Sequence, residues 1–595
     1  RVGLPGSSDG KLHPVLMLSA AFVAVSIVSF LHVRYRYGSF LTLLDFLIYF
    51  FLAVILFRRS WTDRERAGLQ WLLLGSTTLQ AAAAVFTGLT IPEIRPAGFF
   101  ANPNQLAAYL GIGLWVAASR FFAVRGLRIR ASVLASAGIL AVGLILTGSR
   151  GGMAAVAAMV LVAILFGASR VSFRRTVASL VIVLVMGTVA AVALAYRFRT
   201  RIDPYPYARL QIWAAVTRAI ADRPVLGMGP GMLEHRYHNY NPPEVGSWVR
   251  YSKYFRTAHS SYLQILVETG AAGFLCAIAI LGMLLWHLGK RYRRLSGQEP
   301  IPWVLLALGT LMVHGLVENL LEIQAVLLAL LSAVGMELGG DPRRDSAGPQ
   351  GAQVSQRGDG YSGWFRWVGA TGIVYLYWFL VLSPFLADVQ FRKMLAAGDA
   401  PEFGRHFSRA TRFNPYQPYY FWEAAVRIQR AVPRIDLEQF ALVHGYLRTA
   451  IRLEPGEPRF HRDLGRLYDR AFRDLFHDLY TMEKALDSYG EAFTLNTADP
   501  RPLVESARLL RLVGRSEEGL RQLDRALEVE PAFGAAHLER LEILRVTGRT
   551  AEVASGVEKL REDLLARQGY RPRNDYEAGI LKVDPERWNR LRKDH

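Results

Sequence analysis

Two arginines and one histidine have side chains that could act on a charged ligand. Arg150 follows an apolar run in the segment Thr-Gly-Ser-Arg-Gly-Gly, where a charge is costly unless it has a partner or a substrate. Arg209 stands on a short predicted helix, followed by a glycine-rich turn at 227–231. His259 stands where the long loop 197–259 leads into the next apolar run. A lone histidine there more often bonds a backbone group at a helix start, but the two arginines favour a chemical role.

The loop 197–259 is basic and rich in aromatic residues. It has ten Lys and Arg residues against four Asp and Glu residues. Guanidinium groups bind phosphate oxygens in a bidentate manner and aromatic rings pack on sugar rings, so a ligand with phosphate and sugar suits this loop. His235 and His238 have the spacing of a metal pair, but Arg236 stands beside them without a nearby carboxylate pair. We therefore expect solvated histidines, no metal and no cofactor.

These residues must be positioned by a membrane-spanning bundle. Of the 595 residues, 51% are hydrophobic, and the mean hydropathy is +0.17, which is unusual for a soluble chain of this length. Runs of about 18–25 apolar residues, long enough to cross a membrane as helices, recur up to residue 387 and not beyond. They predict an all-α fold with about eleven spans. The expected spans are 13–31, 38–57, 67–88, 104–123, 130–148, 151–168, 176–196, 260–288, 301–317, 320–338 and 364–387.

Charge on alternate loops indicates the orientation of the bundle. Five of these loops are basic, as cytoplasmic loops usually are. They contain Arg58, Arg59, Arg64 and Arg66; Arg120, Arg125, Arg128 and Arg130; Arg170, Arg174 and Arg175; Lys290, Arg291, Arg293 and Arg294; and Arg343 with Arg344. We therefore expect a cytoplasmic N-terminus, with 197–259 and 388–595 outside. Most of the net charge of +20 lies before residue 388, so topology explains it without nucleic-acid binding.

The last third of the chain repeats itself. A stretch rich in Gly, Ser, Gln and Pro, 339–363, predicts a flexible cytoplasmic linker before the last span. Beyond that span, a helix-ending pattern recurs after alanines 40, 42 and 34 residues apart, and the last interval is the tetratricopeptide period. These alanines are Ala410, Ala450, Ala492 and Ala526. The pattern predicts an α-helical solenoid over 388–595 that binds a peptide, a protein or a second copy, or that acts only as a spacer.

Five short motifs run in order across residues 99–273 and together resemble a known superfamily. They are Asn102-Pro-Asn-Gln-Leu-Ala107, Ser149-Arg150-Gly, Arg209 with Trp213, Gly227-x-Gly-x-Gly231, and His259-x-x-Tyr262 with Glu268-x-x-x-x-Gly273. The chain looks like the O-antigen ligase and Wzy-type polymerase superfamily of polytopic glycosyltransferases. The resemblance implies a ligase-like transmembrane domain over 1–338 whose catalytic loop is 197–259. Ligases, polymerases and protein O-oligosaccharyltransferases share this core, so the acceptor stays open.

The resemblance also implies a reaction and its location. The family moves a glycan from an undecaprenyl-pyrophosphate carrier to an acceptor hydroxyl, without metal or nucleotide, at the outer face of the bacterial inner membrane. Arg150 and Arg209 would hold the charge of the pyrophosphate, and direct attack on the anomeric carbon would invert its configuration. His259 would take the acceptor proton or orient the acceptor. Other residues expected at the substrate site are Asn104, Trp213, Tyr262, His314 and Glu318.

His314 and Glu318 leave two interpretations open, because they are one helical turn apart and either line the cavity or form a local hydrogen-bonded pair. The expected partners of the chain are the lipid-linked donor, a glycan, lipid or protein acceptor, membrane lipids and a protein on the repeats.

Two other function classes compete with a transferase. A transporter of the same lipid-linked glycan would place ionisable residues near the bilayer midplane, whereas these stand at the outer boundary. A membrane-tethered scaffold would not need Arg150, Arg209 and His259 together.

Overall fold

A computed structural model describes most of the chain as helices. The described residues are 13–91, 93–168, 208–244, 246–252, 255–294, 302–339, 371, 375 and 378–593. The expected features that lie outside them are the span 176–196, the linker beyond Gly339, most of the span 364–387, the basic loops at 170–175 and 343–344, and the start of the long loop, 197–207. The regular elements of the described residues are all helical.

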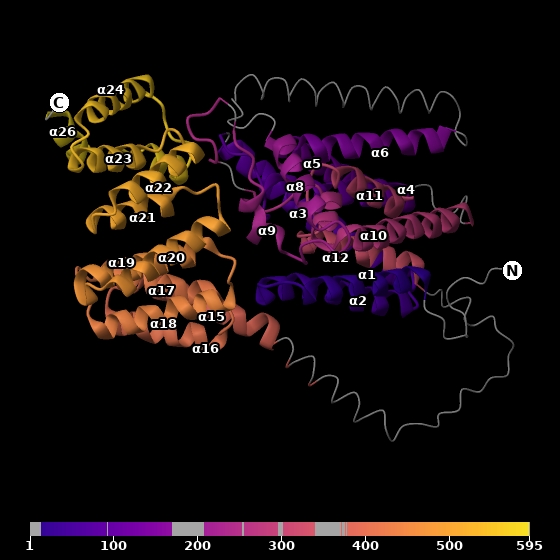
Figure 1. Ribbon diagram of the computed structural model, residues 1–595. Helices are drawn as coiled ribbons and strands as arrows, with labels where there is room; N and C mark the ends of the chain where they lie inside the picture. The colour runs from indigo at the N-terminus through magenta and orange to yellow at the C-terminus, as the bar shows by residue number, and fades with distance from the viewer. Residues whose placement is uncertain are drawn as a thin grey trace. The chain divides into compact units, whose positions relative to one another are not determined.

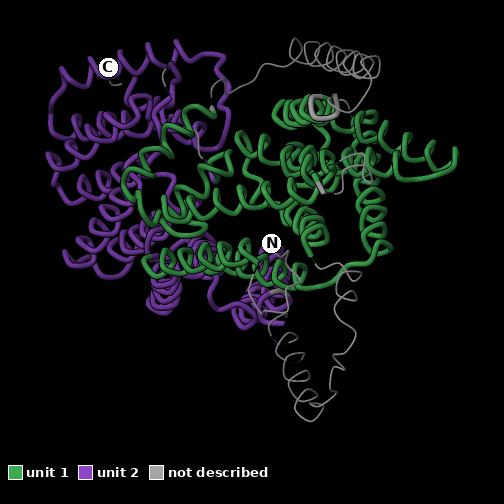
Figure 2. The backbone as a smooth tube through the Cα atoms, turned by 90° about the vertical axis from the view of Figure 1, so that its right-hand side faces the viewer, with its two compact units in different colours: residues 1–32, 40–233, 257–352 green, residues 33–39, 234–256, 353–595 purple. Residues whose placement is uncertain are grey.

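The described chain forms two compact units (Figure 2). The first draws on residues 1–32, 40–233 and 257–352, and the second on 33–39, 234–256 and 353–595. The described part of the long loop is therefore divided between the units at Glu234. Its described residues from Glu234 to Arg256 belong to the second unit, together with the C-terminal helices.

The first unit is built mainly from apolar helices, to which the shorter and more polar α8 is added (Figure 1). They are α1 (Pro14–Leu31), α2 (Arg36–Arg58, whose first turn belongs to the second unit), α3 (Asp63–Thr90), α4 (Pro103–Ala123), α5 (Leu127–Thr147), α6 (Arg150–Ala168), α8 (Ala208–Asp222), α10 (Ser261–Arg294), α11 (Trp303–His314) and α12 (Gln324–Leu338). Among the described residues, six helices (α1 to α5 and α10) are long and apolar enough to cross a membrane. Three more, α6, α11 and α12, are shorter apolar helices, so the predicted count of about eleven spans is not confirmed.

Helix α4 lies in the core of the first unit. More than half of its apolar span is buried, twice the share of any other candidate span in the described residues. It packs against α3, α5, α6 and α11, and two glycines allow this close approach. A Cβ on Gly113 would stand 2.4 Å from the hydroxyl of Thr77, and one on Gly111 would stand 3.2 Å from Thr310. This packing fixes the start of α4, where Asn104 is located.

Helix α10 is broken near its start, and the glycine-rich turn of the long loop fills the break. Gly270 has φ 66° and ψ −171°, which leaves carbonyl and N–H groups of α10 without helical partners. The turn supplies them: Met228 N–H donates to the Val267 carbonyl at 2.9 Å, and Ala271 N–H donates to the Pro224 carbonyl at 2.8 Å. The break thereby attaches the turn to the helix that follows His259.

We predict that Gly270→Ala destabilises the first unit. A Cβ there would lie 2.2 Å from the Val225 carbonyl oxygen, and the positive φ disfavours any side chain. The expected loss is about 2–5 kcal/mol, seen as a lower melting temperature of the detergent-purified protein. Gly282→Ala, in the same helix with no atom within 4 Å of the new Cβ, is the control and should melt like wild type. Equal melting of all three proteins would contradict the role of the break.

The second unit contains helices stacked as antiparallel pairs (Figure 1). The pairs are α15 (Ser383–Ala396) with α16 (Ala400–Phe413), α17 (Pro418–Ala431) with α18 (Leu437–Leu453), α19 (Pro458–Ala471) with α20 (Leu479–Leu495), α21 (Arg501–Leu512) with α22 (Ser516–Val529), and α23 (Gly534–Val546) with α24 (Thr550–Ala566). Two short helices, α25 (Asp575–Leu581) and α26 (Pro585–Lys593), follow them. The π-helical turns Trp378–Leu382 and Phe472–Phe476, the short helix α9 (Leu233–Arg236) and the 3-10 turn Tyr237–Asn239 complete the elements.

The repeated alanines lie in the last turn of the second helix of four successive pairs, as the sequence predicts. Ala410, Ala450, Ala492 and Ala526 are at most 1% exposed, which permits close helix packing. Each carbonyl accepts the N–H of the residue four positions later, namely Asn414, Glu454, Asn496 and Glu530. These four residues share nearly the same conformation, with φ between −128° and −143° and ψ between 85° and 91°. We call them the four turn residues of the repeats.

Segment 234–256 lies along the repeats and contacts several of them. The Glu530 carboxylate accepts the backbone N–H groups of Arg250 and Tyr251, each at 2.8 Å. Arg573 donates to Glu244 at 2.9 Å, and Val249 is fully buried in the core of the last repeats. The repeats therefore bind a segment of their own chain.

His238 is buried and His235 is mostly removed from solvent, so the expectation that they are solvated is wrong. Nδ1 of His235 lies 2.9 Å from Glu454, and the side chain is 18% exposed. Burial lowers the pKa of His235, but the hydrogen bond and charge of Glu454 outweigh it, so the pKa is raised. Burial lowers the pKa of His238 to about 4, so this imidazole is neutral near pH 7.

We predict that Glu530→Ala frees the segment at Arg250 and Tyr251. Both amides lose a charged acceptor, so hydrogen exchange at these two positions should accelerate by about tenfold or more, measured on the full-length protein by mass spectrometry. Glu528→Ala is the matched control, because the exposed Glu528 contributes only its backbone carbonyl to this contact. Unchanged exchange in Glu530→Ala would show that other contacts hold the segment.

Candidate functional site

The Glu318 carboxylate brings together four of the residues singled out in the sequence. Glu318 lies in the turn between α11 and α12, and its side chain is 6% exposed. One oxygen, Oε2, accepts from Asn104 Nδ2 at 2.5 Å and from Arg209 Nη2 at 3.3 Å. The other, Oε1, lies 3.4 Å from Nδ1 of His259. These three partners come from the start of α4, the start of α8 and the segment before α10.

The partners of Glu318 keep it ionised. Burial by itself would raise the pKa of this carboxyl. The hydrogen bond and electrostatic interaction with His259, the charge of Arg209 and the hydrogen bond from Asn104 outweigh burial, so the pKa lies below its ordinary value. Glu318 therefore carries a negative charge near neutral pH and orients both of its cationic or potentially cationic neighbours.

His259 is held in an unusual backbone conformation. Its φ is +47°, a region that side-chain-bearing residues rarely adopt and that persists only where neighbours enforce it. The preceding residue, Ala258, supplies the restraint, since its carbonyl accepts the indole N–H of Trp213 at 3.0 Å and its N–H donates to Gln264 at 2.8 Å. Gln264 in turn donates to the buried Glu268 at 2.6 Å. This chain of contacts aims the imidazole toward Glu318.

Ser261 joins the start of α10 to the turn that carries Glu318. Its hydroxyl donates to the Glu318 carbonyl at 3.1 Å and accepts the Leu320 N–H at 2.9 Å. One turn of α10 also contacts α11, because the Tyr262 hydroxyl donates to the Met312 carbonyl at 3.0 Å. In the described structure Tyr262 and Trp213, both expected to bind substrate, thus bond carbonyl groups of the chain and hold the site together.

Arg150 begins α6 beside this site. Ser149 caps the helix, its hydroxyl accepting the Gly152 N–H at 3.3 Å, and Arg150 is exposed. The following glycines pack against His314 and leave no room for a side chain: a Cβ on Gly151 would lie 2.5 Å from Val317, and one on Gly152 would lie 2.8 Å from Ala107. The Ser-Arg-Gly-Gly segment therefore combines a helix cap, a cation and a surface that only glycine permits.

His314 does not pair with Glu318. It is 1% exposed, its Nδ1 has no hydrogen-bond partner among the described residues, and Glu318 turns toward Asn104, Arg209 and His259. The local hydrogen-bonded pair that the sequence left open is therefore absent from the described structure. His314 packs beneath the site, against the start of α6.

Arg95 belongs to the same network and was missed in the sequence. Its Nε donates to the Thr147 carbonyl at 2.8 Å, and its Nη2 donates to Asn104 Oδ1 at 3.2 Å. It therefore links the end of α5 to the residue that bonds Glu318. A signal was available in the sequence. Arg95 lies in the short loop between the expected spans 67–88 and 104–123, so the cost of a charge at the membrane boundary, which drew attention to Arg150, applies to Arg95 as well.

The arrangement leaves two reactive groups accessible above a buried anion. The side chains of Arg209 and His259 are 42% and 38% exposed, whereas that of Glu318 is 6% exposed. A guanidinium and an imidazole can thus meet a ligand while a carboxylate behind them fixes their orientation. Among the described residues, no group of three or more His, Cys, Asp or Glu side chains could hold a metal ion. The geometry suits anion binding and proton transfer.

Comparison with known proteins agrees with this chemistry. Residues 135–278 match the model of the O-antigen ligase family. The match confirms the resemblance over a segment that contains Arg150, Arg209 and His259. The O-antigen ligase match supports a membrane glycosyltransferase or ligase of this superfamily. Asn104 and Glu318, which complete the cluster, lie outside the matched residues.

Other comparisons concern the whole chain and its repeats. No curated protein sequence matches the chain. Two crystal structures of MamA align with 32% and 28% of this chain and with 97% and 89% of theirs, at 13% identity and TM-scores of 0.27 and 0.24. The crystal structure of yeast Tom70 aligns over 89% of this chain and 96% of its own, at 12% identity and a TM-score of 0.25.

Proposed function

We propose that the chain transfers a glycan from an undecaprenyl-pyrophosphate carrier to an acceptor hydroxyl. The observation that carries this proposal is the Glu318 cluster, which holds Arg209 and His259 together in a chain whose residues 135–278 match the O-antigen ligase family. A partly exposed guanidinium and a partly exposed imidazole, held by one carboxylate, supply both functions that this transfer needs. One binds the leaving pyrophosphate, and the other accepts the proton of the attacking hydroxyl.

In the proposed reaction the acceptor oxygen attacks the anomeric carbon from the side opposite the pyrophosphate. A new C–O bond forms and the bond to the pyrophosphate oxygen breaks, so the configuration inverts and the electron pair leaves with the carrier. Because Nδ1 of His259 faces the carboxylate of Glu318, its proton is held there and Nε2 is left to take the acceptor proton. Glu318 then stabilises the imidazolium that results.

The leaving pyrophosphate gains negative charge as the bond breaks. Arg209 can bind its oxygens while Glu318 holds the guanidinium in place. Arg150 is the first residue of α6, where the positive end of the helix dipole adds to its charge. These two cations stabilise the charge that a metal ion stabilises in other transferases, so the proposed reaction is metal-independent.

The acceptor defines the remaining alternatives within the proposal. A growing glycan makes the protein a polymerase, a lipid makes it a ligase, and a protein hydroxyl makes it an O-oligosaccharyltransferase. A transporter of the lipid-linked glycan or a membrane-tethered scaffold explains the apolar helices, but neither needs a histidine with a positive backbone φ beside a buried carboxylate. We propose that the reaction takes place at the periplasmic face of a bacterial inner membrane.

We predict distinct effects for the two exposed groups. Arg209→Lys keeps the charge but loses the planar fork, so donor affinity should fall and the rate should drop by about 10²–10³. His259→Ala should leave donor affinity nearly unchanged while turnover falls by about 10²–10⁴. Both are measured on purified protein with lipid-linked glycan and candidate acceptors, with and without EDTA.

An arginine of the other unit provides the control for these variants. Arg545→Lys, in α23 of the second unit, should transfer like wild type. Near-normal transfer by both site variants would overturn the assignment of the site. A strict divalent-ion requirement would overturn the metal-free mechanism.

We predict that the repeats lie on the periplasmic side. In a Cys276→Ser background, a cysteine at the exposed Ser555 should react with an impermeant maleimide in cells whose outer membrane alone is permeabilised. A cysteine at Arg125, in a loop expected to be cytoplasmic, is the control and should react only after lysis. The reverse pattern would invert the topology and move the proposed active site to the cytoplasm.

A further inference from the structure

The four turn residues of the repeats form a row of equivalent positions, and three of them already bind polypeptide. Asn414 donates to the Tyr37 hydroxyl at 2.7 Å. Glu454 pairs with His235 at 2.9 Å, and Glu530 accepts two backbone N–H groups of segment 234–256. The repeats thus use one position per helix pair to recognise a polar group of a ligand.

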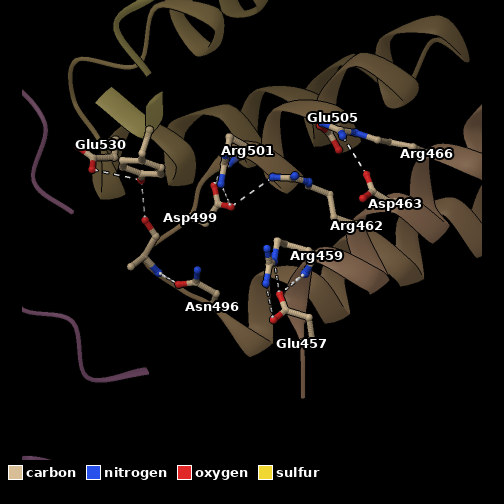
Figure 3. A network of polar contacts seen from close by, with 12 residues as sticks. Glu457, Arg459, Arg462, Asp463, Arg466, Asn496, Asp499, Arg501, Glu505 and Glu530 are labelled. Carbon is tan, nitrogen blue, oxygen red and sulfur yellow. Dashed lines mark hydrogen bonds and ion pairs between the residues drawn. The ribbon is translucent and has the colours of Figure 1, made fainter. Parts of the chain in front are cut away.

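The remaining turn residue, Asn496, opens onto a cavity. Its Oδ1 accepts the Ala498 N–H at 3.2 Å, while its Nδ2 makes no hydrogen bond to the described residues. The cavity has a volume of about 540 Å³ and lies wholly within the second unit, between segment 234–256 and helices α17, α19, α20 and α21. A volume of this size encloses a small molecule. Figure 3 shows Asn496 with five charged residues of the lining, namely Glu457, Arg459, Arg462, Asp499 and Arg501.

Two acid–arginine pairs at equivalent repeat positions line the cavity. Glu457 and Arg459 flank one proline, and Asp499 and Arg501 flank another. In the first pair Nε lies 2.7 Å from the carboxylate, and in the second it lies 2.6 Å away (Figure 3). Each pair presents acceptor oxygens and donor N–H groups side by side, so the walls can both give and receive hydrogen bonds.

The cavity also holds a buried donor without a partner and several aromatic faces. The Nε of Arg462 is buried without a hydrogen-bond partner among the described residues, although Nη1 of the same side chain lies 3.5 Å from Asp499. Leaving a buried donor unsatisfied costs free energy that a bound ligand can recover. Tyr237, Tyr419 and the neutral ring of His238 add aromatic side chains to the same walls, with the Arg459 guanidinium over the ring of Tyr419.

Charge in the lining is nearly balanced. Four arginines face three carboxylates, His235 is paired with Glu454 behind the lining, and the carboxylates Glu457 and Asp499 are already paired with arginines. A phosphate or carboxylate ligand would have to approach these two carboxylates. An uncharged ligand rich in hydroxyl groups meets both the donors and the acceptors without that penalty.

The neighbouring positions limit the shape of the ligand. On one side of Asn496 in the row, Glu454 is paired with His235. On the other side, Glu530 accepts the backbone N–H groups of Arg250 and Tyr251. An extended peptide needs several consecutive positions of such a row, whereas one open position between two filled ones admits a compact ligand.

We propose that the cavity at Asn496 binds an uncharged saccharide of one or two rings. The Asn496 amide and Arg462 donate to sugar oxygens, Asp499 and Glu457 accept from sugar hydroxyls, and the aromatic faces pack on the ring. This site goes beyond the transfer reaction proposed above and does not rest on it, because binding requires no donor, acceptor or bond making. It assigns the repeats a saccharide ligand of their own.

The test measures binding to the full-length protein in detergent. The probes are neutral mono- and disaccharides of hexose and N-acetylhexosamine, the same saccharides carrying one phosphate, and a library of extended peptides. Saturation-transfer NMR selects the saccharides that bind, and titration gives their Kd. Asn496→Asp keeps the side-chain shape but removes the donor, so Kd should rise by about tenfold or more. Arg462→Lys, a second variant that keeps the charge, should also weaken binding.

Matched variants show whether the saccharide binds at this cavity or elsewhere on the chain. Asn414→Asp makes the same change at the equivalent position that contacts Tyr37, and its saccharide affinity should equal that of wild type. His259→Ala should bind saccharide like wild type even if it fails to transfer, so the two proposals can fail independently.

Several outcomes would overturn the proposal. They are the absence of binding by every neutral saccharide, equal affinity of wild type and both cavity variants, and at least tenfold tighter binding of the phosphorylated saccharides. Peptide binding that Asn496→Asp abolishes, without saccharide binding, would assign the cavity to a protein partner instead.

Discussion

The candidate site depends on one buried carboxylate. Glu318 is almost removed from water, and a charge in that position is stable only while its partners remain in place. Those partners are Asn104, Arg209 and His259, which stand on three elements far apart in the sequence. Burying the charge of Glu318 costs free energy. The same charge holds the Arg209 guanidinium and the His259 imidazole at a fixed spacing, and both groups reach the surface.

Close backbone approaches at glycines hold the frame around that carboxylate. Gly270 interrupts α10 so that the turn at Gly227 can supply its missing hydrogen bonds, and Gly151 with Gly152 lets the start of α6 meet His314. In each case a Cβ would collide with a neighbouring segment. The glycines of the sequence motifs are thus explained by packing, and the charged residues between them are the ones left to face a ligand.

The sequence predicted the helices well, because apolar length and repeated alanines depend on local pattern; α4, for example, runs from Pro103 to Ala123 where 104–123 was expected. It also singled out Arg209, His259 and Glu318, since charges at a membrane boundary are few, and Asn104 through its motif, but it missed Arg95. It could not show that Trp213 and Tyr262 turn toward backbone carbonyls, because side-chain direction is set by tertiary packing. For the same reason, the residues around His235 and His238 in the sequence could not show that these side chains pack against the repeats.

The division of the chain into units has a consequence for recombination and design. Helical repeats are usually treated as cassettes that can be added or removed at one junction, but this one is assembled from 33–39, 234–256 and the C-terminal helices. A chimera that exchanged only the C-terminal helices would leave His235 and the amides of Arg250 and Tyr251 facing foreign side chains in place of Glu454 and Glu530. The second unit is therefore discontinuous in the sequence. A graft must carry all three of its segments to preserve the contacts within the unit.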